Sequence, residues 1–132
     1  MNRKIQQVTI VGTGTLGTQI AIVAALSNYE VSVYDEDKNA FIRSNESLRA
    51  RLESKVEQSI FTEDQWASGV EKIRICRSLP KALENADLVI EAVLEDLELK
   101  RKVFGEIDSM APKTAILATN SSSIPVSRIE DA

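Results

Sequence analysis

Histidine is absent from this 132-residue sequence, and cysteine occurs once, as Cys76. Without histidine, the chain lacks the side chain that most often acts as a general acid or base near neutral pH. A single cysteine can form neither an intrachain disulfide nor a metal cluster, so we expect a cytoplasmic protein in which Cys76 is a buried apolar residue. No metal site is predicted. These absences limit the catalysis that the chain can perform.

Long apolar runs and an excess of positive charge are also missing. The longest apolar run, 20–26, is far shorter than the roughly 20 residues of a membrane-spanning helix. The formal net charge of -4 gives no basic field for a nucleic-acid backbone. We therefore expect neither a membrane nor a nucleic acid as a partner. A chain that is 43% hydrophobic and 27% charged is typical of one globular domain.

Strand and helix patterns alternate along the chain. Short apolar runs, rich in β-branched residues, predict buried strands at 8–11, 31–34, 73–75, 88–90 and 115–118. Helical spacing of apolar residues predicts helices at 16–26, 38–58 and 97–110. This alternation predicts an α/β fold with a doubly wound, mainly parallel sheet covered by helices on both faces, the Rossmann type.

Local signals predict where several helices begin or end. Thr62 and Gln65 have the spacing of a capping box, which predicts a short helix that pairs with helix 38–58 as an arm inserted after the second strand. Pro80 is typical of the first turn of another short helix. Asn28 tolerates the left-handed conformation, so we expect it to close the first helix where a glycine is more usual.

A glycine-rich loop joins the first strand to the first helix, and its six residues are Gly12, Thr13, Gly14, Thr15, Leu16 and Gly17. The G-x-G-x-x-G spacing is weak by itself, but here a predicted strand precedes it and a predicted helix follows it. Gly12 would permit the tight turn, Gly14 would let a pyrophosphate approach the backbone, and Gly17 would let the helix pack on the strand. Amide groups at the helix start would compensate the phosphate charge.

An acidic residue, Asp35, ends the next predicted strand 23 residues after Gly12. Its carboxylate would accept hydrogen bonds from the ribose hydroxyls and repel the extra phosphate of NADP, so NAD is the predicted cofactor. The alternative is a tight turn beside a solvated acid. Flavin and adenosylmethionine binders share parts of this pattern, so the loop does not identify a reaction.

Two later segments, taken with the glycine loop, resemble the 3-hydroxyacyl-CoA dehydrogenases over essentially the whole chain. They read ADLVIEAVLEDLELK (86–100) and ILATNSSSI (116–124). The resemblance implies hydride transfer between the 3-hydroxyl of an acyl-CoA substrate and NAD. It also implies a catalytic histidine, a glutamate that orients it, and an all-helical domain that completes the substrate site and forms a homodimer. We expect these parts beyond residue 132, so that 1–132 is an NAD-binding domain that is inactive alone.

The resemblance implies roles for five further residues. Ser122 would hydrogen-bond the reacting oxygen of the substrate, and Asn120 would line the same pocket. Glu95 and Lys100 would contact the cofactor near its nicotinamide ribose, and Ala92 would lie against the cofactor where the fourth strand ends. These positions agree with ligand binding at the carboxyl ends of the strands.

The residues alone leave other interpretations open. Glu95 and Lys100 could be surface charges, and the serines at 121–123 could cap a helix that begins near Pro125. Glu91 and Glu95 could suggest acid–base catalysis, but no nucleophile–base pair accompanies them. The basic residues of the arm indicate a solvated face rather than a site for CoA phosphates; they are Arg49, Arg51 and Lys55.

Two other functions also remain open. One is a hydroxyacid or polyol dehydrogenase of the gulonate or carnitine type, and the other is a nonenzymatic NAD-binding sensor. The asparagine–serine segment favours the acyl-CoA branch, although Ser121 stands where threonine is usual. A histidine roughly 20 residues after Ser122 would favour a dehydrogenase over a sensor.

Overall fold

The computed structural model describes residues 4–54, 61–120 and 124–131, and for 52–54 the backbone alone. The strands are β1 (Gln7–Val11), β2 (Glu30–Tyr34), β3 (Ile73–Ile75), β4 (Leu88–Glu91) and β5 (Ile116–Thr119). The helices are α1 (Thr15–Leu26), α2 (Ala40–Ser54), α3 (Glu63–Glu71), α4 (Leu79–Leu83), α5 (Leu97–Met110) and the 3-10 helix η1 (Val126–Arg128). This alternation confirms the predicted α/β fold.

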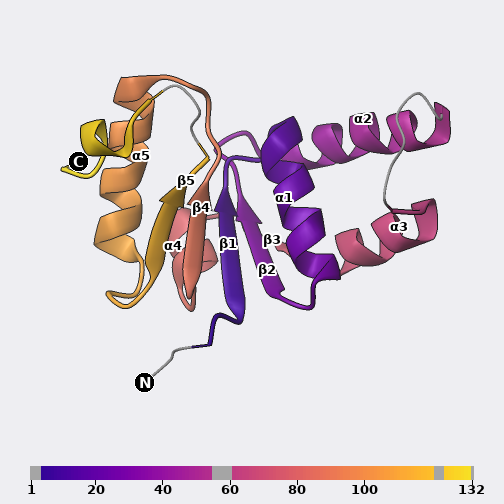
Figure 1. Cartoon of the computed structure of the whole chain (residues 1–132), viewed down its shortest axis with the longest axis horizontal. Helices are drawn as coiled ribbons and strands as arrows, with labels where there is room; N and C mark the ends of the chain where they lie inside the picture. The colour runs from indigo at the N-terminus through magenta and orange to yellow at the C-terminus, as the bar shows by residue number, and fades with distance from the viewer. Residues whose placement is uncertain (1–3, 55–60, 121–123, 132) are drawn as a thin grey trace.

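The strands form one parallel sheet in the order β3-β2-β1-β4-β5 (Figure 1). The chain runs outward from β1 to β3, then returns to place β4 on the other side of β1. The strand register aligns Tyr34, Val11, Glu91 and Thr119 across four strands. The carboxyl ends of these strands therefore meet at one edge, where the strand order reverses and where such sheets bind ligands.

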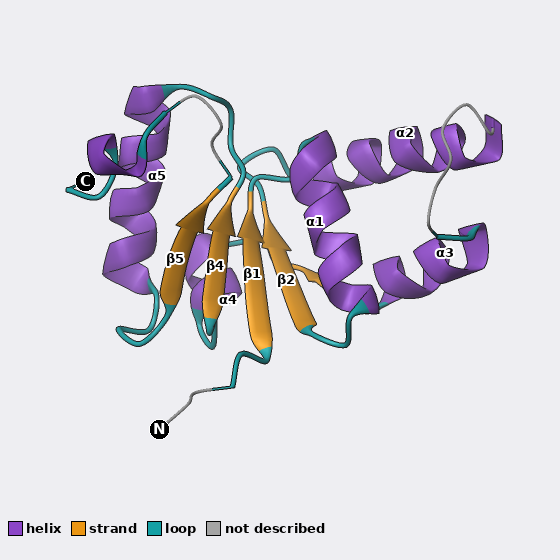
Figure 2. Ribbon diagram, viewed as in Figure 1, coloured by secondary structure: helices purple, strands orange, loops and turns teal. Residues whose placement is uncertain are grey.

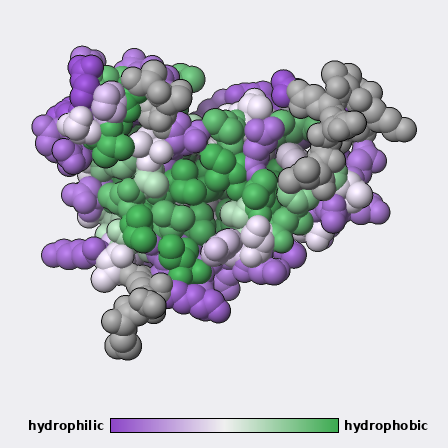
Figure 3. Space-filling model, in the orientation of Figure 1, coloured by the Kyte–Doolittle hydropathy of each residue, from purple (hydrophilic) through white to green (hydrophobic). Residues whose placement is uncertain are grey.

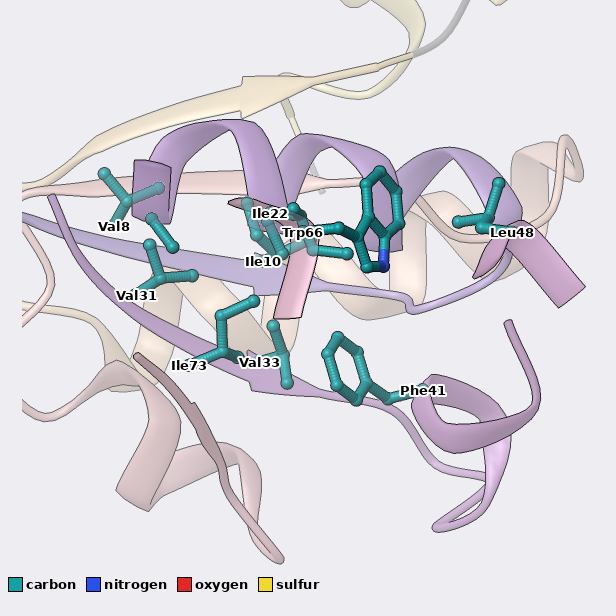
Figure 4. Close-up of a cluster of buried hydrophobic side chains, with 11 residues drawn as sticks. Val8, Ile10, Ile22, Val31, Val33, Phe41, Leu48, Trp66 and Ile73 are labelled. Atoms are coloured by element: carbon teal, nitrogen blue, oxygen red, sulfur yellow. The ribbon is translucent and has the colours of Figure 1, made fainter. Parts of the chain in front are cut away.

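Each face of the sheet has its own apolar core. On one face, α1, α2 and α3 pack on β1 and β2 through a cluster that includes Ile10, Ile22 and Val33 (Figure 4). On the other face, α4 and α5 pack on β1 and β4 through Leu83, Ile107 and neighbouring side chains. Helices thus lie on both faces, as predicted, with α1 in front of β3 and α4 behind β4 in Figure 2.

Helices α2 and α3 form the predicted arm beside α1 (Figure 1). Phe41, Leu48 and Trp66 are large buried apolar side chains among its described residues, and Trp66 Nε1 donates to Asn45 Oδ1 at 2.8 Å, which ties the two helices together. The predicted capping box is present, because Thr62 and Gln65 exchange hydrogen bonds at the start of α3.

The first helix of the arm begins later than predicted, at Ala40 rather than at residue 38. The Asp37 side chain accepts a hydrogen bond from the backbone N–H of Asn39, so the chain first makes a turn. Arg43 also hydrogen-bonds Asp37, which lowers the pKa of that carboxyl below its ordinary value, with a further contribution from the Asn39 N–H. The end of the predicted helix, 55–58, lies outside the described residues.

Asn28 closes α1, as predicted, with a positive φ of 70°. Its N–H donates to Ala25 O and the N–H of Tyr29 donates to Ala24 O, the hydrogen bonds of a left-handed helix end.

A broad hydrophobic surface crosses the middle of the molecule between α5 and α1 (Figure 3). Ile116 of β5 is 55% exposed and Val23 of α1 is 44% exposed. Among the described residues, β5 pairs with β4 alone.

No helix of the described segments is both long and apolar enough to span a membrane.

Candidate cofactor site

The glycine loop (residues 12–17) leaves β1 and enters α1 at the edge where the strand order reverses. Gly12 has a φ of +99°, and a Cβ on it would lie 2.7 Å from the carbonyl carbon of Ala92. A Cβ on Gly17 would lie 2.0 Å from Gly12 O. The tight turn and the close helix–strand packing predicted for these two glycines are therefore confirmed.

Gly14 differs from these two glycines, because a Cβ on it would meet no atom within 4 Å. It is exposed, has an ordinary negative φ of -67° and occupies the N-cap position of α1 without a side-chain cap. The first turn of α1 also contains no acidic residue. The positive end of the helix dipole thus faces open space, an arrangement that suits an anion that approaches the backbone closely.

Asp35 lies beside the glycine loop at the end of β2. Its Oδ2 accepts hydrogen bonds from the N–H and the hydroxyl of Thr13, at 2.7 and 3.3 Å, and its Oδ1 accepts from the N–H of Asp37. Thr13 is fully buried, and its carbonyl accepts from Thr18 Oγ1 and from Ser44 Oγ on the arm. The structure therefore brings the predicted acid and the predicted loop together.

Sequence reasoning did not identify Ser44, whose hydroxyl lies 2.8 Å from Thr13 O. The two residues are 31 positions apart, and nothing in the local pattern of α2 distinguishes this serine from its polar neighbours. The bond links the arm directly to the glycine loop.

The β4 exit (residues 91–96) forms the other wall of this edge. Ala92 donates its N–H to Val11 O at 2.8 Å and contacts the glycine loop at Gly12 and Gly17. Glu91 is 0% exposed and Lys100 is 1% exposed, and Lys100 Nζ lies 2.7 Å from Glu91 Oε2. The interpretation of Lys100 as a surface charge is therefore wrong: the Glu91 carboxylate draws its ammonium into the protein.

Glu95 shares the same ammonium from the surface side. Its side chain is 37% exposed, and its Oε1 lies 3.5 Å from Lys100 Nζ. The carbonyl of Val93 is a third acceptor near this ammonium, at 3.4 Å. Glu95 is thus the member of this charged group that a ligand at the β4 exit could reach.

The substrate residues implied by the resemblance are only partly described. Asn120 follows β5 directly, has an exposed side chain and donates its N–H to Glu91 O at 2.8 Å. Ser122 lies outside the described residues, as do its neighbours 121 and 123, so the alternative of a helix cap is not tested there. η1 follows Pro125 without a side-chain cap. Arg49 and Arg51 of the arm are exposed, and Lys55 is outside the described residues.

A cavity of about 450 Å³ lies beside the end of β5. Apolar side chains such as Phe104, Leu117 and Ile129 line it, together with the carboxylates of Asp108 and Glu130. Thr119, the residue before Asn120, also lines this cavity. The sequence pattern did not predict it, because its walls come from α5, β5 and η1 together.

The fold and this edge define a dinucleotide-binding domain of the doubly wound class. Residues 7–132 match the family model described as "3-hydroxyacyl-CoA dehydrogenase, NAD binding domain". The chain belongs to this family, and the family's cofactor is NAD.

Known proteins similar to this chain have names that agree with the family. It is 35% identical over 125 residues to the 3-hydroxyadipyl-CoA dehydrogenase of Escherichia coli (strain K12), a match that covers 95% of this chain and 26% of the relative. It is 34% identical over 126 residues to the probable 3-hydroxybutyryl-CoA dehydrogenase of Bacillus subtilis (strain 168), a match that covers 96% of this chain and 44% of the relative.

A solved structure shows the same fold. The crystal structure of 3-hydroxybutyryl-CoA dehydrogenase from Escherichia coli K12 matches with a TM-score of 0.80 and 35% sequence identity, covering 96% of this chain and 27% of that one. The chain therefore spans less than half the length of each of these three proteins.

Proposed function

We propose that this chain supplies the cofactor-binding part of an NAD-dependent 3-hydroxyacyl-CoA dehydrogenase, which interconverts the 3-hydroxyl and 3-keto forms of an acyl-CoA. The observation that carries this proposal is the open approach at Gly14, where an uncapped helix start lies beside Asp35 and the β4 exit. When bound, NAD supplies the hydride acceptor for the alcohol.

The chain's own residues would divide the cofactor between the two walls of the edge. The backbone amides of Thr15 and Leu16, two exposed residues in the first turn of α1, would bind the diphosphate, and Asp35 would accept hydrogen bonds from the adenosine ribose. Ala92 and Glu95 would lie against the nicotinamide ribose, and Lys100, whose ammonium lies 3.5 Å from Glu95 Oε1, would act on it from behind Glu95. The residues present fit the cofactor, because backbone N–H groups at the start of α1 suit a diphosphate, and the carboxylates of Asp35 and Glu95 suit ribose hydroxyls.

The substrate side would begin at the end of β5. Asn120 would line the pocket for the acyl-CoA, and Ser122 would donate a hydrogen bond to the reacting oxygen. The family's histidine base has no counterpart in this sequence. Since general acid–base assistance contributes about 10²–10⁴-fold, the 132-residue chain should bind cofactor but show negligible turnover.

The setting of the whole enzyme is part of the same proposal. We expect a cytoplasmic enzyme, because the single cysteine is free and buried, and a homodimer formed through a further helical domain. The pI of about 4.9 is also unfavourable for binding to nucleic acid.

Calorimetric titration of the chain with NAD and NADP tests the cofactor assignment. NAD should bind more tightly, because Asp35 accepts the ribose hydroxyls and repels an added phosphate. Asp35→Asn should reduce this preference, whereas Asp108→Asn, an exposed acid on α5, should leave it unchanged. If NADP bound the unaltered chain as tightly as NAD, the role assigned to Asp35 would be wrong.

A further inference from the structure

A buried carboxylate at the end of β4 has no role in the cofactor contacts assigned above. Glu91 is the last residue of β4 and is 0% exposed, on an edge where the neighbouring Glu95 is 37% exposed. A fully buried carboxylate is rare unless it is paired, because leaving water disfavours the charged group strongly. The groups that pair with the Glu91 carboxylate therefore indicate its role.

The Glu91 carboxylate joins three segments of the chain. Oε2 accepts from the N–H of Val93 in the β4 exit and from Lys100 Nζ in the first turns of α5, both at 2.7 Å. Oε1 accepts from Thr119 Oγ1 at the end of β5, at 2.6 Å. One carboxylate thus fixes the loop after β4, the start of α5 and the last residue of β5 relative to one another.

The ammonium of Lys100 connects this buried carboxylate to the surface. It lies between Glu91, at 2.7 Å, and the partly exposed Glu95, at 3.5 Å, and it approaches the carbonyl of Val93. With Lys100 1% exposed, its position is set from the protein interior rather than by solvent. Loss of the Glu91 charge would leave Glu95 as the nearest carboxylate and would draw the ammonium and Glu95 together.

We propose that Glu91 is a positioning residue for the nicotinamide half of NAD, acting through Lys100 to hold Glu95 and the β4 exit in the arrangement that the cofactor requires. This inference rests on the proposed function, since it assumes that NAD binds along this edge. Glu91 need not touch the cofactor. We expect its effect to be largest at the β4 wall, because none of its side-chain hydrogen bonds reaches the glycine loop or Asp35.

A comparison of the affinities for NAD and ADP distinguishes a positioning role of Glu91 from a purely structural one. ADP carries the diphosphate and the adenosine ribose but lacks the nicotinamide half, so it reports on the glycine loop and Asp35 alone. Glu91→Gln keeps the shape of the side chain, and its amide can still accept from Val93 and donate to Thr119, but the charge beside Lys100 is lost. We expect the Kd for NAD to rise about tenfold while the Kd for ADP changes less than about twofold.

A double-mutant cycle tests the path through Lys100. The measured quantity is the ratio of the affinity for NAD to the affinity for ADP. If Glu91 acts through Lys100, Glu91→Gln should change the ratio by less than about twofold once Lys100→Met is present. Independent, multiplying effects would overturn the proposal. Glu98→Gln, the same change at an exposed position in the first turn of α5, is the matched control and should leave the ratio unchanged.

A second variant covers the case in which Glu91→Gln does not fold. Thr119→Val removes one hydrogen bond to Glu91 but keeps both charges of the ion pair. The affinity for NAD relative to ADP should fall about threefold, in the same direction as for Glu91→Gln. Equal weakening of NAD and ADP in folded variants would overturn the positioning role. If the unaltered chain bound ADP as tightly as NAD, the inference would fail while the adenosine half of the site would stand. Binding of neither would contradict the proposed function itself.

Discussion

The two walls of the candidate site meet where Gly12 contacts Ala92, but they keep their shapes by opposite means. The glycine loop contains no charged side chain, and its shape depends on two positions where even a Cβ would collide with backbone atoms. The β4 exit depends instead on a buried ion pair between Glu91 and Lys100. One wall excludes even a Cβ at Gly12 and Gly17, and the other requires two matched charges.

This difference predicts how substitutions at each wall should affect the stability of the fold. A substitution in the glycine loop produces a local steric conflict that the backbone can relieve only by moving. Removal of the Lys100 charge at the β4 exit leaves the Glu91 carboxylate buried without its cation, and desolvation of an unpaired ion is more costly than most steric conflicts in proteins. Variants at the two walls should therefore differ in the size of their effect on stability.

The largest effect should come from Lys100→Met. It leaves the fully buried Glu91 carboxylate without its cation, so the free energy of unfolding should fall by about 3–5 kcal/mol. Urea denaturation, monitored by circular dichroism, measures the change in the free energy of unfolding. Lys102→Met, at an exposed position on the same helix, is the control and should change stability by less than about 0.5 kcal/mol.

Combining Lys100→Met with Glu91→Gln sharpens this test. The double variant should recover part of the lost stability, because the buried site no longer holds an unpaired charge. Additive losses in the double variant would show that charge pairing does not set the shape of the β4 exit.

Gly17→Ala should have the next largest effect. The new Cβ would lie 2.0 Å from Gly12 O and 3.3 Å from Ala92 Cβ, so α1 must move away from the loop. Overpacking of this kind typically destabilises by about 1–3 kcal/mol, and contact with rigid backbone favours the upper part of that range. The same denaturation experiment measures it, and stability equal to that of the unaltered chain would contradict the close packing.

Gly14→Ala should leave stability nearly unchanged but weaken NAD binding. The φ of -67° is accessible to alanine and the Cβ meets no protein atom, so unfolding should change by less than about 0.5 kcal/mol. A Cβ directed at the approaching diphosphate should raise the Kd for NAD about tenfold. Calorimetry measures the affinity, and an unchanged Kd would mean that the diphosphate does not approach Gly14.

Local signals explain why the sequence predicted the fold and the glycine loop. Each strand and helix has its own periodic pattern, and the bounds of α5 match the predicted 97–110 because Asp96 caps it and Pro112 follows it. The requirement for Gly12 and Gly17 is likewise local, since the turn joins neighbouring elements. Asp35 was found because a fixed spacing relates it to that turn.

The long-range contacts of the site could not be predicted in this way. A lysine in the first turns of a helix is usually exposed, and only the fold brings Lys100 next to a carboxylate nine residues earlier. The bonds from Ser44 to Thr13 and from Thr119 to Glu91 join residues 31 and 28 positions apart. Such pairs depend on how the sheet is assembled, and no pattern within one segment encodes them.

The smallest effect should come from Asp37, at the outer side of the glycine-loop wall. The hydrogen bond from Arg43 lowers the pKa of this exposed carboxyl in the folded chain, so its contribution to stability is present above the ordinary aspartate pKa. That contribution is lost as the pH falls through the lowered, folded-state pKa. Asp37→Asn should therefore shift the urea midpoint slightly at neutral pH and leave it unchanged well below that pKa. Equal shifts at both pH values would show that Asp37 acts through its turn at Asn39 rather than through its charge.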